Sequence, residues 1–172
     1  MPHILWPTNA YKLGAATMFT LFFGGNEFAP KKMVGDKRIQ DFFQDAYIAS
    51  VQLVASRLAK YENVIGYDIM NEPLPGYIGC KDLNKNYGIY QLGLMPSPFQ
   101  GMILGDGNSE LVTVWEQKYL AIRNVGKKLL NPKKNRAWQK DVNCVWREHG
   151  IWDYNLSGNP VLLKPSYFKL YD

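Results

Sequence analysis

The sequence predicts an α/β fold in which a helix leads into a buried parallel strand. Three neighbouring features support it: an amphipathic pattern over residues 39–60, a connection of only three residues, 61–63, and a nearly unbroken apolar run over 64–70. Such a short connection is typical of a helix that feeds a parallel strand. A continuous apolar run is typical of a strand covered on both faces. The order of these features is that of an α/β protein.

The first element along the chain is an apolar block over residues 10–24. Its alanines and Met18 favour a helix, whereas its Thr and Phe residues would suit a buried strand, and periodicity does not decide between the two. Gly24 and Gly25 are expected to end the element. Residues 25–38 are expected to form a loop.

The second element is the helix over residues 39–60. Its apolar positions recur at steps of three and four and form one stripe, namely Ile39, Phe43, Tyr47, Val51, Val54 and Leu58. Asp36 is placed to cap its start. We therefore expect an amphipathic helix that lies on another element, and expect its stripe to be exposed if the partner strands are missing.

The third element is the strand over residues 64–70, which stops at Pro73 because proline cannot donate to a strand ladder. Glu72 is thereby left at the carboxyl end of the strand, the edge at which α/β folds do their chemistry. Asp68 alternates onto the same face as Glu72. If that face is the interior of a barrel, Asp68 is buried and needs a cationic or hydrogen-bonding partner.

Regular structure is less evident after Pro73. Residues 73–109 are predicted to form a long connection. The many apolar side chains of this segment argue against disorder. Residues 110–130 are expected to be helical. Beyond them, Trp138, Trp146 and Trp152 mark a compact, aromatic-rich segment, and a short apolar run follows over 161–163.

Composition narrows the function classes. The chain has 172 residues and a net charge of +5, which would attract acidic partners such as nucleic acid or an anionic membrane. Its basic residues are dispersed and no nucleic-acid-binding motif is present, so nucleic acid is not the expected partner. Cys80 and Cys144 suit one disulfide or two reduced thiols equally well. Neither lies near a histidine at ligand spacing, and no metal site is expected.

Membrane and targeting signals are not evident. No apolar stretch is long enough to span a membrane. The N-terminus lacks the basic region and the long apolar core of a signal peptide, which favours a cytoplasmic or membrane-peripheral location.

Asn71-Glu72-Pro73, read with the strand before it, resembles the fourth-strand signature of glycoside hydrolase family 5. The resemblance extends through most of the chain and is to the fungal glucosylceramidase and steryl-β-glucosidase branch, which is related to the endoglycoceramidases. The similar stretches are Trp6–Asn9, Ala15–Gly25, Asn63–Pro73, Gly76–Gly79, Pro96–Gly107, Cys144–Trp152 and Leu162–Phe168.

The resemblance implies a retaining hydrolase that removes glucose from steryl glucosides or glucosylceramide without a cofactor. Glu72 would be the general acid/base, and Asn71 would hydrogen-bond the 2-hydroxyl of the sugar. A glycolipid substrate also implies peripheral contact with a membrane. Tyr77, Met95, Phe99 and Met102 would either line the aglycone cleft or fill a core.

The layout implied by the resemblance is a partial (β/α)8 barrel. The chain would be an internal fragment of a catalytic domain that holds helix three, strand four and a long insertion over 73–168. The nucleophile carboxylate, which the family supplies from its seventh strand, is not found, so we expect the chain alone to be inactive. The alternative is an inactive remnant that still binds sugar or lipid. Glu148 beside His149 is a second candidate acid/base pair, although such a histidine is more often structural or substrate-lining.

Overall fold

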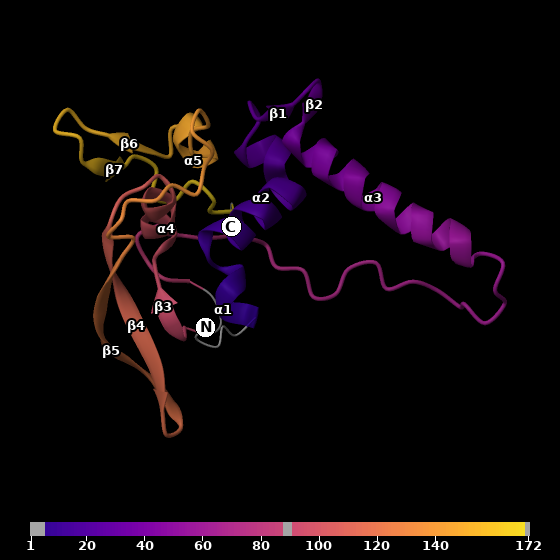
Figure 1. Ribbon diagram of the computed structural model, residues 1–172, viewed down its shortest axis with the longest axis horizontal. Helices are drawn as coiled ribbons and strands as arrows, with labels where there is room; N and C mark the ends of the chain where they lie inside the picture. The colour runs from indigo at the N-terminus through magenta and orange to yellow at the C-terminus, as the bar shows by residue number, and fades with distance from the viewer. Residues whose placement is uncertain (1–5, 88–90, 171–172) are drawn as a thin grey trace.

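The computed structural model describes residues 6–87 and 91–170. A body gathers the N-terminal helices, the strands and the C-terminal segment, and an arm made of one long helix and the returning chain projects from it (Figure 1). The elements are α1 (Trp6–Ala10), α2 (Leu13–Phe28), β1 (Met33–Val34), β2 (Lys37–Arg38), α3 (Ile39–Leu58), β3 (Gly93–Met95), α4 (Pro98–Gly105), β4 (Glu110–Lys118), β5 (Ala121–Leu130), α5 (Val145–Glu148), β6 (Trp152–Tyr154) and β7 (Pro160–Leu162).

The apolar block is a helix, α2, which settles the choice left open by its sequence. The two glycines bend this helix rather than end it, because only Gly24 leaves helical geometry (φ −142°, ψ 22°) and the helix continues to Phe28. Gly25 lets the start of α3 approach closely, since a Cβ there would lie 3.1 Å from the Cγ2 atom of Ile39. The expected loop over 25–38 is thus partly wrong, and its second half forms the small hairpin β1–β2.

The predicted second helix is confirmed as α3. Asp36 does not cap it: the first helical turn follows Arg38, whose side chain makes no capping bond, because Asp36 lies in the turn of the β1–β2 hairpin. Ile39 at the start of the apolar stripe is buried against the body, whereas Val54 near its far end is 50% exposed. In the outer half of the stripe, Val54 is therefore uncovered, whereas Val51 and Leu58 are half-buried.

The strand predicted over residues 64–70 is absent from the described structure. These residues return beside α3 as an extended segment, in which Ile65 and Ile69 are strongly exposed. A strand forms only where a neighbour pairs its backbone N–H and C=O groups, and no described strand lies beside this segment. Asp68 is accordingly exposed instead of buried. The described sheets are all antiparallel, so the fold is a mixture of helices and small sheets without a parallel sheet.

Residues 110–130 form the antiparallel pair β4–β5, and the expected helix is wrong. The β-branched run of Val112, Thr113 and Val114 prefers extended backbone and outweighs the helical spacing. β3 pairs with the inner part of β4, from Gly93 opposite Trp115 to Met95 opposite Thr113. The sheet is therefore three-stranded only along the middle of the long β4–β5 ribbon (Figure 1).

The core of the body is aromatic. Tyr77, Trp146 and Phe168 are fully buried and pack ring against ring, with centroids 5.0 to 5.7 Å apart. Trp152 is also fully buried, and Trp138 packs against this core from its edge. The compact aromatic segment predicted from the three tryptophans is thus confirmed.

Cys80 and Cys144 lie in the same core as free, buried thiols. Burial raises the pKa of both thiols, which lowers the fraction of reactive thiolate. We expect the native chain to react with iodoacetamide at least about tenfold more slowly than the urea-unfolded chain. Peptide mass spectrometry resolves the two sites, and fast native labelling of Cys144 would contradict this packing.

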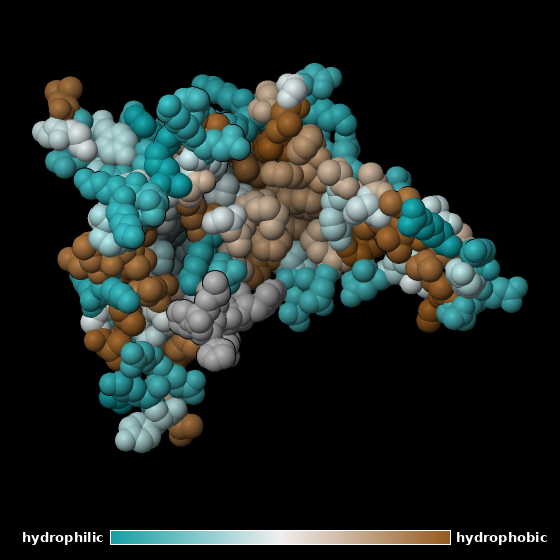
Figure 2. Space-filling view, viewed as in Figure 1, coloured by the Kyte–Doolittle hydropathy of each residue, from teal (hydrophilic) through white to brown (hydrophobic). Residues whose placement is uncertain are grey.

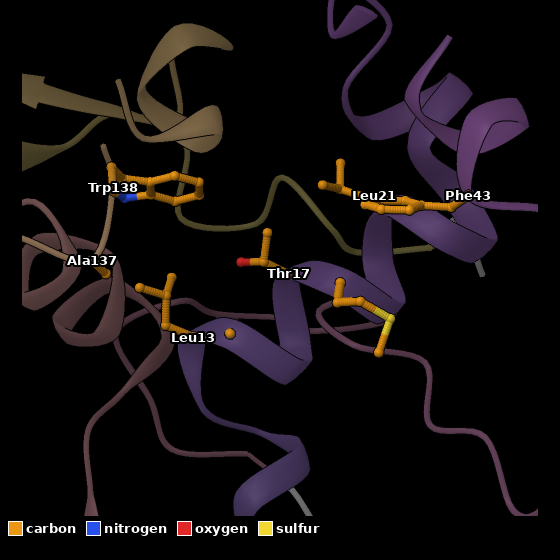
Figure 3. A pocket seen from close by; sticks show the side chains of 8 residues that line it. Leu13, Thr17, Leu21, Phe43, Ala137 and Trp138 are labelled. Carbon is orange, nitrogen blue, oxygen red and sulfur yellow. The ribbon is translucent and has the colours of Figure 1, made fainter. Parts of the chain in front are cut away.

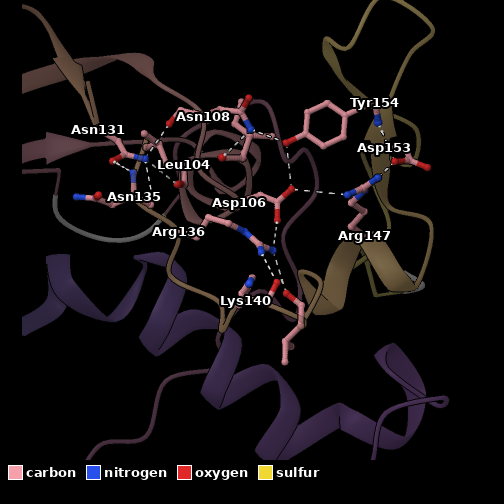
Figure 4. Close-up of polar contacts among 12 residues, drawn as sticks. Leu104, Asp106, Asn108, Asn131, Asn135, Arg136, Lys140, Arg147, Asp153 and Tyr154 are labelled. Atoms are coloured by element: carbon pink, nitrogen blue, oxygen red, sulfur yellow. Dashed lines mark hydrogen bonds and ion pairs between the residues drawn. The ribbon is translucent and has the colours of Figure 1, made fainter. Parts of the chain in front are cut away.

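A buried carboxylate, Asp106, joins the end of α4 to the C-terminal elements (Figure 4). Its side chain is only 5% exposed and accepts hydrogen bonds from Arg136 Nη2 at 3.2 Å and from the Tyr154 hydroxyl at 3.0 Å. Arg147 Nη1 lies 3.8 Å away. Since these partners come from three separate segments, Asp106 holds together parts of the body that lie far apart in sequence.

Asp106→Asn is expected to lower the free energy of unfolding by about 2 kcal/mol, because the substitution leaves two guanidinium groups without their shared anion. Urea denaturation measures this loss. Asp153→Asn is the matched control: Asp153 pairs with the same Arg147 at 2.7 Å but is solvent-exposed, so little change is expected. Equal effects of the two substitutions would contradict the role given to Asp106.

Candidate functional site: an apolar cavity beside Asn71 and Glu72

The packing of α2 against α3 leaves an apolar hollow between the body and the arm (Figure 2). A cavity of about 500 Å³ lies there, closed on one side by the segment that returns from α3. Its lining consists of Met18, Phe19, Phe22, Phe43, Ala46, Tyr47, Met70, Asn71 and Pro73. The cavity is thus almost wholly apolar, and Asn71 and Pro73 of the predicted motif form part of its lining.

A second cavity of about 290 Å³ continues the hollow along α2 (Figure 3). It shares Met18 and Phe43 with the first cavity and extends to Trp138. Thr17 contributes a hydroxyl to its wall, and this oxygen accepts a hydrogen bond from Trp146 Nε1 at 2.9 Å. The two cavities together form one elongated apolar trough.

The chain just after the motif is fixed to α2 at Gly76. This glycine has φ 65°, and a Cβ on it would lie 2.5 Å from the backbone nitrogen of Thr20, so only glycine allows the approach. The next residue, Tyr77, donates its backbone N–H to the Thr20 hydroxyl at 2.7 Å. Tyr87 donates its hydroxyl to the carbonyl of Gly76 at 2.8 Å. These contacts anchor the chain four residues after Glu72.

Asn71 lines the first cavity, Glu72 follows it in the chain, and both are exposed. Glu72 has φ 42°, a left-handed conformation that is uncommon for a residue other than glycine. Such backbone conformations are found more often at functional sites than elsewhere. Apart from Asn71, the lining of this cavity offers only the Tyr47 hydroxyl as a polar side-chain group, and it contains no Asp, Glu or His. Glu72 is thus exposed between two residues that line the apolar cavity, Asn71 and Pro73, without lining the cavity itself.

Asp68 lies apart from this cavity. It lines a smaller one of about 310 Å³ beside α3, with Tyr67 and Ile69 of the same segment. The structure therefore does not bring Asp68 and Glu72 together at a single cavity.

The alternative pair, Glu148 and His149, holds α5 to the segment before β1. Glu148 forms an ion pair with Lys32 at 2.9 Å. The Nε2 atom of His149 accepts the backbone N–H of Lys31 at 3.3 Å, and its Nδ1 atom lies 2.7 Å from the carbonyl of Val145. Both ring nitrogens thus have backbone partners if Nδ1 carries the proton, which supports a structural role for this histidine.

The residues that line the cavity are not the four that the resemblance suggested for an aglycone cleft. Tyr77, Met95 and Met102 are buried in the body, and Phe99 packs against Trp152. These four residues fill the core. The residues that do line the cavity come in equal numbers from α2, α3 and the returning segment, and sequence reasoning missed those of α2. The sequence did contain a signal for them. Because α2 is uniformly apolar, some of its large side chains must remain exposed, and Met18 and Phe23 are each about 40% exposed.

Other kinds of site find little support in the described ranges. Among residues 6–87 and 91–170, no three potential ligands cluster in a way that would hold a metal ion. No helix within these ranges combines the length and apolar character needed to cross a bilayer.

Comparison with known proteins gives relatives along nearly the whole chain, although no family model matches it. It is 38% identical over 168 residues to a glucosylceramidase of Rhizopus delemar, covering 96% of this chain and 24% of the relative. It is 32% identical to an ergosteryl-beta-glucosidase of Saccharomyces cerevisiae, covering 97% of this chain and 26% of the relative. The crystal structure of Cryptococcus neoformans sterylglucosidase 1 matches with a TM-score of 0.86 and 33% identity, over 97% of this chain and 27% of that one.

These matches agree in sequence and in fold. The chain spans about a quarter of the length of each of these relatives. It is homologous to one segment of fungal enzymes named glucosylceramidase and steryl-β-glucosidase.

Proposed function

We propose that this chain belongs to glycoside hydrolase family 5 and forms the acid/base segment of a retaining β-glucosidase that acts on glucosylated lipids. The relatives are named for glucosylceramide and steryl glucoside substrates, which supports the substrate class. The observation that carries the proposal is that Asn71 and Pro73, the two neighbours of Glu72 in the motif, line an apolar cavity. A carboxylate beside an apolar surface suits a substrate with a sugar on one side and a lipid on the other.

In the proposed mechanism, Glu72 first protonates the glycosidic oxygen as the lipid leaves. It then removes a proton from the water that releases glucose from the enzyme. A group that protonates this oxygen must sit where sugar and aglycone meet, so the aglycone has to lie against the surface next to Glu72. The trough along α2 meets this requirement. Asn71 would hydrogen-bond the 2-hydroxyl of the sugar.

We further propose that residues 64–70 form the fourth strand of a (β/α)8 barrel when neighbouring strands are present, and that residues 73–168 are an insertion after this strand. The exposed apolar side chains of Ile65 and Ile69 support this, since they would be buried between flanking elements. The exposed Leu53 and Val54 of α3 support it too, because barrel helices pack on strands.

A retaining mechanism also requires a second carboxylate about 5 Å from the first. No Asp or Glu joins Asn71 in the lining of the described cavity. In our proposal this nucleophile comes from the part of the relatives' length that the chain does not span. The isolated chain is therefore expected to release no glucose.

The decisive experiment is a chimera in which this chain replaces the matching quarter of Cryptococcus neoformans sterylglucosidase 1. Release of glucose from a steryl β-glucoside by the folded chimera, and its loss on Glu72→Gln, would support the proposal. Circular dichroism and thermal melting establish that each chimera folds. A folded chimera that retains Glu72 yet cleaves no β-glucoside would overturn it.

The same apolar cavity also favours a second candidate, a remnant that binds lipid without hydrolysis. The two candidates give different results in the chimera. Saturable binding of a fluorescent sterol by the folded chimera, without any release of glucose, would select the second candidate and exclude the first.

A further inference from the structure

The β4–β5 ribbon extends well beyond the body. β3 covers β4 only between Thr113 and Trp115, so the outer pairs, from Glu116 opposite Arg123 to Lys118 opposite Ala121, have no third strand. The ribbon projects away from the body on the side opposite the β1–β2 hairpin (Figure 1). The tip of the ribbon is therefore the first part of the molecule to contact a partner that approaches from this side.

The tip consists of Tyr119 and Leu120, whose side chains are 98% and 103% exposed. No packing in the described structure accounts for either side chain. Tyr119 has φ 56°, at the first of two turn residues, where a type II′ hairpin turn favours glycine. Tyrosine is thus conformationally unfavourable at this turn position. Its presence at an exposed tip indicates that the side chain interacts with a partner outside the body.

Two cations, Lys118 on β4 and Arg123 on β5, and one anion, Glu116 opposite Arg123, lie near the tip, and all three are exposed. At about 3.3 Å per residue, Arg123 lies roughly 10 Å from Leu120 along its strand, which is about one Debye length. Lys127 and Lys128 lie more than about 20 Å from the tip by the same measure. A surface that meets the tip end-on would therefore interact mainly with these three charges, whose sum is positive.

We propose that the Tyr119–Leu120 tip inserts into the interface of an anionic lipid bilayer and that Lys118 and Arg123 contact the lipid headgroups. An aromatic ring with one polar end suits the level of the headgroups, and a leucine suits the acyl boundary below them. Basic side chains at the same level add attraction to anionic lipids. The inference does not rest on the proposed hydrolase activity, because membrane binding is measured without any release of glucose.

The test is cosedimentation of the full chain with vesicles of phosphatidylcholine and phosphatidylserine in a 7:3 ratio. Tyr119→Gly/Leu120→Ser is expected to lower the partition coefficient about tenfold or more. This double substitution supplies residues that suit the turn, so thermal unfolding should occur at the same temperature or a higher one. Leu156→Ser is the matched control, since Leu156 is 109% exposed but lies in the loop between β6 and β7.

Charge variants test the end-on geometry. Lys118→Gln/Arg123→Gln is expected to weaken binding to the mixed vesicles about tenfold or more, and Lys127→Gln/Lys128→Gln to change it less than about twofold. Each of three outcomes would overturn the proposal: unchanged binding by the tip variant, an equal loss with Leu156→Ser, or equal losses with the two charge pairs. Binding that is displaced by RNA and insensitive to the tip variant would likewise overturn the proposal and indicate nucleic acid as the partner.

Discussion

Glu72→Gln is expected to lower the release of glucose from a steryl β-glucoside by roughly 10²- to 10⁴-fold in the chimera described above. Glutamine keeps the size of the side chain but can neither donate nor accept the proton that each step requires. A sterol alkoxide is a very poor leaving group, so the first step depends strongly on protonation of the glycosidic oxygen. Steady-state assays of glucose release measure the loss.

A substrate with a better leaving group distinguishes an acid/base role of Glu72 from a nucleophile role. A dinitrophenyl β-glucoside expels a stable phenolate and does not need an acid, so the first step should survive Glu72→Gln while the second, general-base step remains slow. The expected result is a rapid burst of dinitrophenolate followed by a slow steady state. Azide, which attacks without a general base, should restore turnover and yield a β-glucosyl azide.

Glu62→Gln is the control for this experiment, because Glu62 is an exposed glutamate at the start of the same returning segment. Glu62→Gln should leave the rate of glucose release, the burst of dinitrophenolate and the response to azide unchanged. Loss of the burst in Glu72→Gln would instead assign Glu72 as the nucleophile. An unchanged rate on the steryl glucoside would remove Glu72 from the mechanism altogether.

The elements that could be predicted from sequence are those specified by local pattern. The α3 helix follows from an apolar stripe that repeats with the helical period over 20 residues. The aromatic body follows from the density of tryptophan and tyrosine. Local pattern also placed Asn71 and Glu72 in one short motif, and the structure puts that motif beside a cavity.

The predictions that failed depended on partners distant in sequence. Residues 64–70 have the composition of a buried strand, but a strand needs a neighbour, and none of the described strands is placed to pair with it. Residues 110–130 were wrongly expected to be helical, because their preference for extended backbone is realised only when β4 and β5 pair. The cavity itself could not be predicted, since its walls come from α2, α3 and the returning segment, which meet only in the folded chain.

Gly76→Ala is expected to lower the free energy of unfolding by about 4 kcal/mol, the largest effect on stability that we predict for a single methyl group. Two penalties add. A left-handed φ costs alanine about 1 kcal/mol relative to glycine. The new Cβ would also overlap the backbone of α2 at Thr20, so the segment must withdraw and give up the hydrogen bonds of Tyr77 and Tyr87.

Gly79→Ala separates these two penalties. Gly79 also has a left-handed φ, 84°, but a Cβ there would meet no heavy atom within 4 Å, so its substitution carries only the conformational cost. The difference between the two variants in urea denaturation therefore measures the docking of residues 76 and 77 on α2. Equal losses would show that this contact contributes nothing. A larger loss for Gly76→Ala, with Glu72 only four residues away, would make the α2 contact the anchor that sets the position of the proposed acid/base.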